Sequence, residues 1–174
     1  MRVNADAMTL YAVTDRTWVE DTTLMDQVKE ALEGGITFLQ LREKHLSKEE
    51  FIKEAREMKE LSKEYKVPFV INDNIEVALA VDADGVHIGQ DDMSVEEARK
   101  LLGEDKIIGV SAHNVEEAIK AQKGGADYLG VGAVCATSTK KDANVVSKEE
   151  IKKICHTVEI PVVAIGRSEE RRVG

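Results

Sequence analysis

The sequence lacks the features that mark several large classes of protein. Basic residues are fewer than acidic ones, with 24 lysines and arginines against 33 aspartates and glutamates, and no basic stripe is present. Nucleic acid is therefore not expected as a partner. Long apolar runs are absent, so no membrane contact is predicted. The two cysteines, Cys135 and Cys155, form no CxxC pair and are expected to pack as free thiols. With the polar start MRVNADAM, these absences predict a cytoplasmic protein.

What the sequence does contain is a regular alternation of apolar strands and amphipathic helices. Its 174 residues suit one domain, although they are few for an α/β barrel. Six helical segments separate seven strand-like segments, and the helix between the third and fourth strands is short. Strands are predicted at 10–15, 38–43, 68–73, 85–89, 107–113, 128–133 and 161–166. This alternation predicts a parallel sheet covered by helices.

Helix starts are signalled by a repeated pair, a capping residue followed three positions later by glutamate. In such a pair the cap side chain accepts from the backbone of the glutamate, which can bond back to the cap. Another helix is predicted over 22–33, ending at the glycine pair 34–35. The four pairs are Ser47/Glu50, Ser94/Glu97, Asn114/Glu117 and Ser147/Glu150.

A barrel is favoured over a doubly wound sheet, which the same alternation allows. The unit repeats evenly, and no GxGxxG follows the first strand. Most chemically interesting residues come directly after a strand, and these positions share one face of a βα barrel. They are Asp15, Arg42, Lys44, Asn72, Asp73, Asn74, Gln90, Asp92, Ser111, His113, Thr137, Ser138, Thr139 and Lys140.

Two aspartates that follow neighbouring strands are candidate metal ligands. Asp73 ends the segment PFVIND and Asp92 ends GVHIGQDD. Carboxylates at adjacent strand ends can converge on a hard cation such as Mg²⁺, which takes few protein oxygens and completes its shell with substrate phosphates. Helix N-capping is the alternative for either residue, and Asp91 is the weaker candidate, better explained as a cap or a supporting group.

Cationic and hydroxyl side chains predict a phosphate site at the same face. Arg42 and Lys44 alternate along an extended segment, and a guanidinium with an ammonium suits a diphosphate. A salt bridge to Glu43 or to a helix acid is the alternative. The Thr-Ser-Thr-Lys loop at 137–140 is a candidate anion nest or an ordinary polar loop. His87, inside an apolar strand, is predicted to be a core or barrel-mouth histidine rather than a base.

Five blocks of the sequence resemble the thiamine phosphate synthase family in order and spacing, across residues 10–166. They are QLREK at 40–44, INDN at 71–74, DGVHIGQDD at 84–92, IGVSAHN at 108–114 and GVGAV with TSTKKDA at 130–143. The resemblance implies a (β/α)₈ TIM-barrel transferase. Its reaction joins 4-amino-5-hydroxymethyl-2-methylpyrimidine diphosphate to hydroxyethylthiazole phosphate, giving thiamine phosphate and diphosphate.

The resemblance also implies a role for each matching residue. Mg²⁺ is expected on Asp73 and Asp92. Arg42, Lys44, Ser111 and Lys140 are the implied catalytic residues, and no His or Cys base is required because the thiazole nitrogen is already a nucleophile. The implied substrate-binding residues are Gln40, Leu41, Arg42, Glu43, Lys44, Asn72, Ser111 and Lys140 for the pyrimidine diphosphate, Thr137, Ser138 and Thr139 for the thiazole phosphate, and Gly166.

The sequence departs from the family pattern at two places. Cys135 and Ala136 stand where the family has an aromatic residue and proline, which could loosen the thiazole side. After IPVVAIG the chain reads RSEERRVG instead of a glycine-rich loop and an eighth strand. Residues 1–166 are therefore interpreted as an incomplete barrel of about seven strands, without the last βα unit, and 167–174 as a non-native tail. An open barrel puts the stability and activity of this chain in doubt.

Two alternative functions stay open at this stage. A thiazole tautomerase-like barrel would share the fold but needs no diphosphate or metal site, so QLREK with Asp73 and Asp92 argues against it. An inactive fragment that binds a phosphate ligand would use the same residues without turnover. The expected partners are small-molecule substrates, and the oligomeric state, a homo-oligomer included, is left undetermined.

Overall fold

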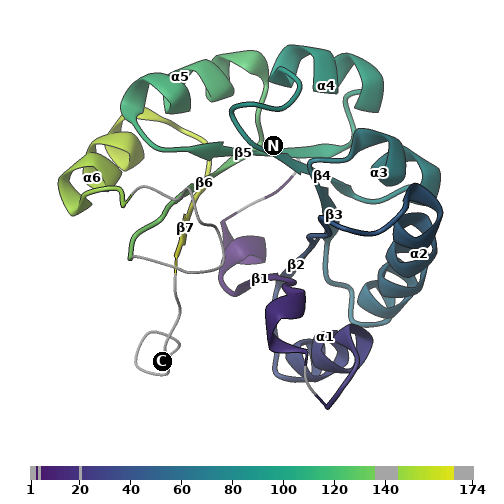
Figure 1. Cartoon of the computed structure of the whole chain (residues 1–174). Helices are drawn as coiled ribbons and strands as arrows, with labels where there is room; N and C mark the ends of the chain where they lie inside the picture. Colours follow the sequence, from purple (N-terminus) through teal and green to yellow (C-terminus); the bar gives the residue numbers. More distant parts are fainter. Residues whose placement is uncertain (1–2, 4, 20, 136–144, 167–174) are drawn as a thin grey trace.

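A parallel β-sheet forms the centre of the molecule. The computed structural model describes residues 3, 5–19, 21–135 and 145–166, and within them seven strands pair in sequence order, each parallel to the next. The sheet curls into a nearly closed barrel (Figure 1). The predicted seven-stranded barrel is thus confirmed. The strands are β1 (Tyr11–Val13), β2 (Phe38–Leu41), β3 (Phe69–Asn72), β4 (Gly85–Ile88), β5 (Ile107–Ala112), β6 (Tyr128–Gly132) and β7 (Val162–Ile165).

The helices lie on the outer side of the curved sheet (Figure 1). Each connects one strand to the next, as parallel pairing requires. The described α-helices are α1 (Leu24–Glu33), α2 (Lys48–Glu64), α3 (Ile75–Val81), α4 (Val95–Leu102), α5 (Val115–Gly124) and α6 (Lys148–Thr157), with 3₁₀ turns η1 (Asp6–Met8) and η2 (Arg16–Trp18). The helix between the third and fourth strands, α3, is the shortest, as predicted. None of the helices in the described ranges has the length and apolar character to span a bilayer.

The predicted helix starts are confirmed, although in two of them the glutamate side chain does not bond back to the backbone of the capping residue. All four capping side chains accept from the backbone N–H of the glutamate three residues on: Ser47, Ser94, Asn114 and Ser147. The Glu150 carboxylate accepts instead from the N–H of Val115, so the start of α6 is tied to the start of α5. A fifth cap, Thr23 with Asp26, opens α1 and was missed because its acid is aspartate.

Two apolar cores lie on opposite sides of the sheet. The larger core fills the space between strands and helices, and it holds Leu39 and Leu41 of β2. A smaller core inside the barrel contains Phe38, Tyr128 and Ile107, the first residues of their strands. Val3 and Met8 pack into this inner core, so the N-terminal segment closes the barrel at the end where the strands begin. The other end is left for the loops that follow the strands.

Side-chain hydrogen bonds tie the strands together in pairs at the closed end. In each pair, the residue just before an even-numbered strand accepts from a backbone N–H that lies within one residue of the start of the preceding strand. The three bonds run from the Leu10 N–H to Thr37 Oγ1 (2.9 Å), from the Phe69 N–H to Asp84 Oδ2 (2.8 Å) and from the Ile108 N–H to Asp127 Oδ2 (2.9 Å). We call these bonds the strand staples. They join β1 to β2, β3 to β4 and β5 to β6.

Candidate active site

The two candidate metal ligands lie together at the open end of the barrel. Asp73 follows β3 directly, and Asp92 lies in the loop after β4, where its Oδ2 accepts from the Gly89 N–H at 2.7 Å. Lys44, from the loop after β2, places its Nζ 2.5 Å from Asp73 Oδ2. Burial raises the pKa of Asp92, the Gly89 N–H lowers it, and the Asp73 carboxylate raises it again, so the two acids act on one another.

Helix capping, the alternative for these aspartates, is wrong. The N-cap of α3 is Asn74, whose side chain accepts from the Val77 N–H, and the N-cap of α4 is Ser94. Asp73 instead has a left-handed backbone, with φ of +60°, and its N–H donates to the His87 carbonyl at 2.8 Å. A residue other than glycine rarely adopts this conformation, and such residues concentrate at functional sites.

The carboxylate pair offers oxygen atoms of the kind that can hold a magnesium ion. Mg²⁺ is commonly held by one or two protein carboxylates and completes its shell with water and substrate phosphates. No group of three or more acid, His or Cys side chains able to hold a metal occurs among the described residues. Asp73 and Asp92 could therefore bind the ion only together with oxygens from a ligand or water. Lys44 already brings a positive charge to the same acids.

Arg42 lies at the same end of the barrel, directly after β2, and is held by the end of β1. Its backbone N–H donates to Thr14 Oγ1 at 2.9 Å, and its Nη1 lies 3.4 Å from Asp15 Oδ2. Asp15 is also the N-cap of η2. The long ion-pair distance leaves the guanidinium weakly restrained. The alternative for Arg42 and Lys44 is a salt bridge to Glu43 or to a helix acid. In the described structure both side chains do form ion pairs, Arg42 with Asp15 at the start of η2 and Lys44 with Asp73, and neither pairs with Glu43.

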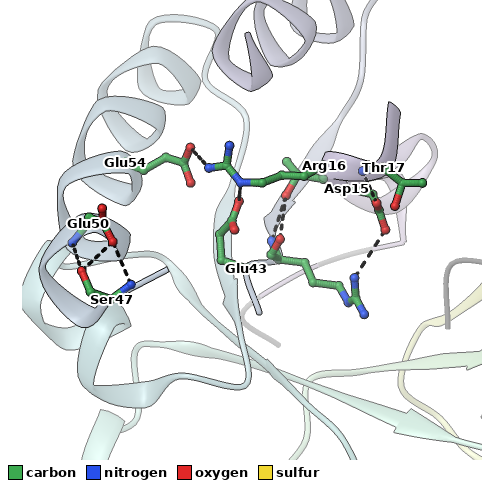
Figure 2. A network of polar contacts seen from close by, with 9 residues as sticks. Asp15, Arg16, Thr17, Glu43, Ser47, Glu50 and Glu54 are labelled. Atoms are coloured by element: carbon green, nitrogen blue, oxygen red, sulfur yellow. Dashed lines mark hydrogen bonds and ion pairs between the residues drawn. The ribbon is translucent and has the colours of Figure 1, made fainter. Parts of the chain in front are cut away.

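Glu43, a predicted binding residue, turns its carboxylate away from this group. Its side chain is 3% exposed and lies 2.8 Å from Arg16 Nε, while Arg16 Nη2 lies 2.5 Å from Glu54 Oε1. Figure 2 shows Arg16 reaching both carboxylates. Burial raises the pKa of Glu54, Arg16 lowers it and Glu43 raises it. We call these three residues the arginine clamp. The clamp joins η2, the loop after β2 and helix α2, and no local pattern in the sequence predicts it.

A chain of polar side chains crosses the barrel interior between two other predicted site residues. Gln40 Nε2 donates to Tyr11 Oη at 2.7 Å, and Tyr11 Oη lies 2.6 Å from Tyr128 Oη. Tyr128 Oη lies 3.0 Å from His87 Nδ1, and His87 Nε2 lies 3.0 Å from Ser111 Oγ. We call this the interior chain. Its histidine is bonded at both ring nitrogens, which confirms the prediction of a satisfied core histidine.

Two strand glycines make room for the interior chain. A Cβ atom on Gly109 would lie 2.0 Å from Tyr128 Cζ, and one on Gly130 would lie 2.9 Å from His87 Cε1. Neither tyrosine was among the residues predicted from the sequence. Glycine inside a strand often marks a close approach by another group, and the pair at 109 and 130 was the available signal.

The remaining predicted residues divide into those near this end of the barrel and those outside the described ranges. Asn72 is buried as the last residue of β3. The Leu41 side chain lies in the outer core, so this residue can meet a ligand only through its main chain. Gly166, with φ of +122°, follows β7 and packs against Ala133 and Val134 after β6. Thr137, Ser138, Thr139 and Lys140 lie outside the described residues.

Comparisons with known proteins agree on one family. The sequence model of thiamine monophosphate synthase matches residues 10–174. The thiamine-phosphate synthase of Clostridium acetobutylicum is 54% identical over 161 residues, which is 92% of this chain and 76% of that protein. That of Clostridium tetani is 50% identical over 95% of this chain and 79% of its own length. The structure of thiamine phosphate pyrophosphorylase from Pyrococcus furiosus superposes with a TM-score of 0.87 at 41% identity, covering 97% of this chain and 79% of that one.

Proposed function

The chain belongs to the thiamine monophosphate synthase family, and we propose that its open barrel end joins the pyrimidine diphosphate to the thiazole phosphate described above, releasing diphosphate. One observation carries the proposal at the level of the site. Lys44, Asp73 and Asp92 gather where strands β2, β3 and β4 end, and Arg42, paired with Asp15, follows β2 at the same end of the barrel. A diphosphate with its metal ion needs this combination of two cations and two carboxylates.

The cations act on the leaving group. Breaking the bond between the pyrimidine methylene carbon and the diphosphate oxygen leaves negative charge on diphosphate. Lys44 and Arg42 would bind this charge, and the loose 3.4 Å contact between Arg42 and Asp15 can be exchanged for a phosphate oxygen at small cost. Mg²⁺ on Asp73 and Asp92 would neutralise further charge on the departing diphosphate when bound.

The uncharged residues orient the two rings. The methylene carbon gains positive charge that the aminopyrimidine ring stabilises, so the protein has to hold that ring in place. Gln40 and Ser111, at the two ends of the interior chain, are the residues we assign to this task. The thiazole nitrogen needs orientation rather than a base, and we assign its phosphate to residues 137–140 from the family resemblance. His113 is not required, because its ring is paired with Glu117 at 2.9 Å at the start of α5.

The proposal is tested by diphosphate release from the two substrates, with and without Mg²⁺. Asp92→Asn should lower turnover by about 100-fold or more at limiting Mg²⁺, since it removes one of two charged ligands. Asp91→Asn is the matched control, because Asp91 is exposed, adjacent in sequence and not a helix cap, and it should stay near wild type. Wild-type turnover in Asp92→Asn would refute the metal assignment.

The alternatives give different results in the same assay. A tautomerase-like barrel would bind the thiazole phosphate without any diphosphate release. A fragment that only binds would take up inorganic diphosphate in a Mg²⁺-dependent manner, measurable by titration calorimetry, and show no turnover. Release that depends on both substrates and on Mg²⁺ supports the synthase.

A further inference from the structure

We propose that the interior chain donates hydrogen bonds in one direction, from Gln40 to Ser111, and that His87 is thereby a positioning residue that makes the Ser111 hydroxyl a donor toward the pyrimidine ring. The ligand in this statement rests on the proposed function. The direction does not, because it follows from the donors and acceptors of the side chains themselves.

The direction is set at the Gln40 end. An amide nitrogen only donates, so Tyr11 Oη accepts from Gln40 Nε2. Tyr11 has one proton to give, and the acceptor described for it is Tyr128 Oη at 2.6 Å. Tyr128 Oη is then occupied as an acceptor and gives its own proton to His87 Nδ1. Burial raises the pKa of both tyrosines well above the ordinary value of 10.0, so both hydroxyls keep their protons.

The hydrogen bond that His87 accepts at Nδ1 determines the one that it donates to Ser111. With Nδ1 accepting, the ring proton of neutral His87 lies on Nε2, which donates to Ser111 Oγ at 3.0 Å. The Ser111 hydroxyl proton must then point to a different acceptor. Ser111 is partly exposed at the end of β5, whereas His87, Tyr128 and Gln40 are buried, so the chain ends at the substrate side of the barrel.

Packing holds the rings of the interior chain in place. The Tyr128 ring lies 5.7 Å from the ring of Phe38 and against Gly109, and Phe38 in turn lies 4.7 Å from the ring of Tyr11. The carbonyl of Ser111 is held separately, because it accepts from Gln90 Nε2 at 2.6 Å. Reversing the bond between the two tyrosines would leave the Tyr11 proton without an acceptor among its described contacts, and it would also reverse the bond to His87, since each hydroxyl has a single proton.

A fixed direction has a consequence for recognition. Ser111 can offer a hydrogen to a ring nitrogen, and Gln40, which donates with its amide nitrogen, still has an amide oxygen that can accept from an amino group. An aminopyrimidine carries both complementary groups. A heteroaromatic ring that carries an N–H at the position of the acceptor nitrogen would place two donors face to face at Ser111.

The direction is tested first without any substrate, by ¹⁵N NMR of the four histidines in the whole chain, with His87→Gln used to assign the signal. We expect the Nε2–H tautomer at His87, and the Nδ1–H tautomer would overturn the proposal. Tyr128→Phe removes the donor to Nδ1 and should shift the signal toward a mixture of tautomers. Tyr65→Phe, an exposed tyrosine at the end of α2, is the matched control and should change nothing. Tyr11→Phe, which leaves Tyr128 in place, is the second variant if Tyr128→Phe does not fold.

The positioning role is tested by a double-mutant cycle between Tyr128 and Ser111. Ser111→Ala should lower kcat/KM for the pyrimidine diphosphate about 10-fold in the wild type and less than about 3-fold in the Tyr128→Phe background. Equal effects in both backgrounds would overturn the role of the chain. A folded protein with the Nε2–H tautomer and no diphosphate release would refute the proposed function and leave the direction of the chain standing.

Discussion

Replacing Arg16 with methionine should destabilise the protein in a way that depends on pH. The variant leaves Glu43, 3% exposed, and Glu54, 20% exposed, without their shared cation. A buried carboxylate without a partner takes up a proton rather than stay charged. The free-energy cost of that protonation at pH 7, for a carboxyl group with an ordinary pKa of 4.5, is about 3.4 kcal/mol, which is the ceiling for one acid.

The expected loss is smaller than this ceiling. The pKa of Glu54 is already raised in the intact clamp, so part of the cost is present before the substitution. Arg16 itself is 45% exposed, and water screens its interaction with the acids. We therefore expect a loss of about 2 kcal/mol at pH 7, between that of an exposed and a buried ion pair. For a chain of this size it corresponds to a fall in Tm of about 4–8 °C.

The sign of the pH dependence identifies the cause. A carboxyl pKa that is raised in the folded state contributes stability below the ordinary pKa, and this contribution is lost as pH rises through the raised value. Arg16→Met should raise the pKa of Glu54 further. The unfolding free energy of the variant should therefore fall furthest below that of the wild type near pH 7, and the two values should be nearly equal at pH 5. Urea unfolding at both pH values measures it.

Two further variants decide whether the clamp is responsible. Arg56→Met removes an exposed arginine of α2 and should cost less than about 0.5 kcal/mol at either pH. Adding Glu54→Gln to Arg16→Met removes one of the two acids and should recover about half of the loss. An equal loss at pH 5 and pH 7, or no recovery in the double variant, would refute this account of the clamp.

Three further predictions concern the barrel and its helices. Gly109→Ala places a methyl group 2.0 Å from Tyr128 Cζ and should cost about 3 kcal/mol or more in urea unfolding; a neutral result would mean that the ring has another place to go. Asp127→Asn keeps the staple acceptor for the Ile108 N–H but leaves Arg99, 10% exposed, without its acid, and should lower the unfolding free energy by about 2–4 kcal/mol. Asp84→Asn is the comparison: its described partner is a backbone N–H, so it should lower the unfolding free energy by about 1 kcal/mol or less. Ser147→Ala removes the cap of α6 and should lower the unfolding free energy by about 1 kcal/mol, with Ser47→Ala as a second cap for comparison.

The sequence could predict whatever depends on neighbours along the chain. Strands, helix starts and the short α3 follow from apolar spacing and capping pairs a few residues apart. The meeting of Asp73 and Asp92 was also predictable, because strand ends in a parallel barrel share one face. The arginine clamp and the interior chain were not, since Arg16 meets Glu54 across 38 positions and Tyr11 meets Tyr128 across 117. Such contacts depend on how the sheet curves, and no local sequence pattern predicts that curvature.

The strand staples divide the barrel into modules of two strands. Each staple joins an odd strand to the even strand after it, and the crossovers within those modules are α1, α3 and α5. A chain split within α2 or α4 would therefore keep every staple inside one fragment, while a split within α3 or α5 would separate a donor from its acceptor. Complementing halves of this barrel, and sites for inserting a second domain, are accordingly best sought at the junctions after β2 and β4.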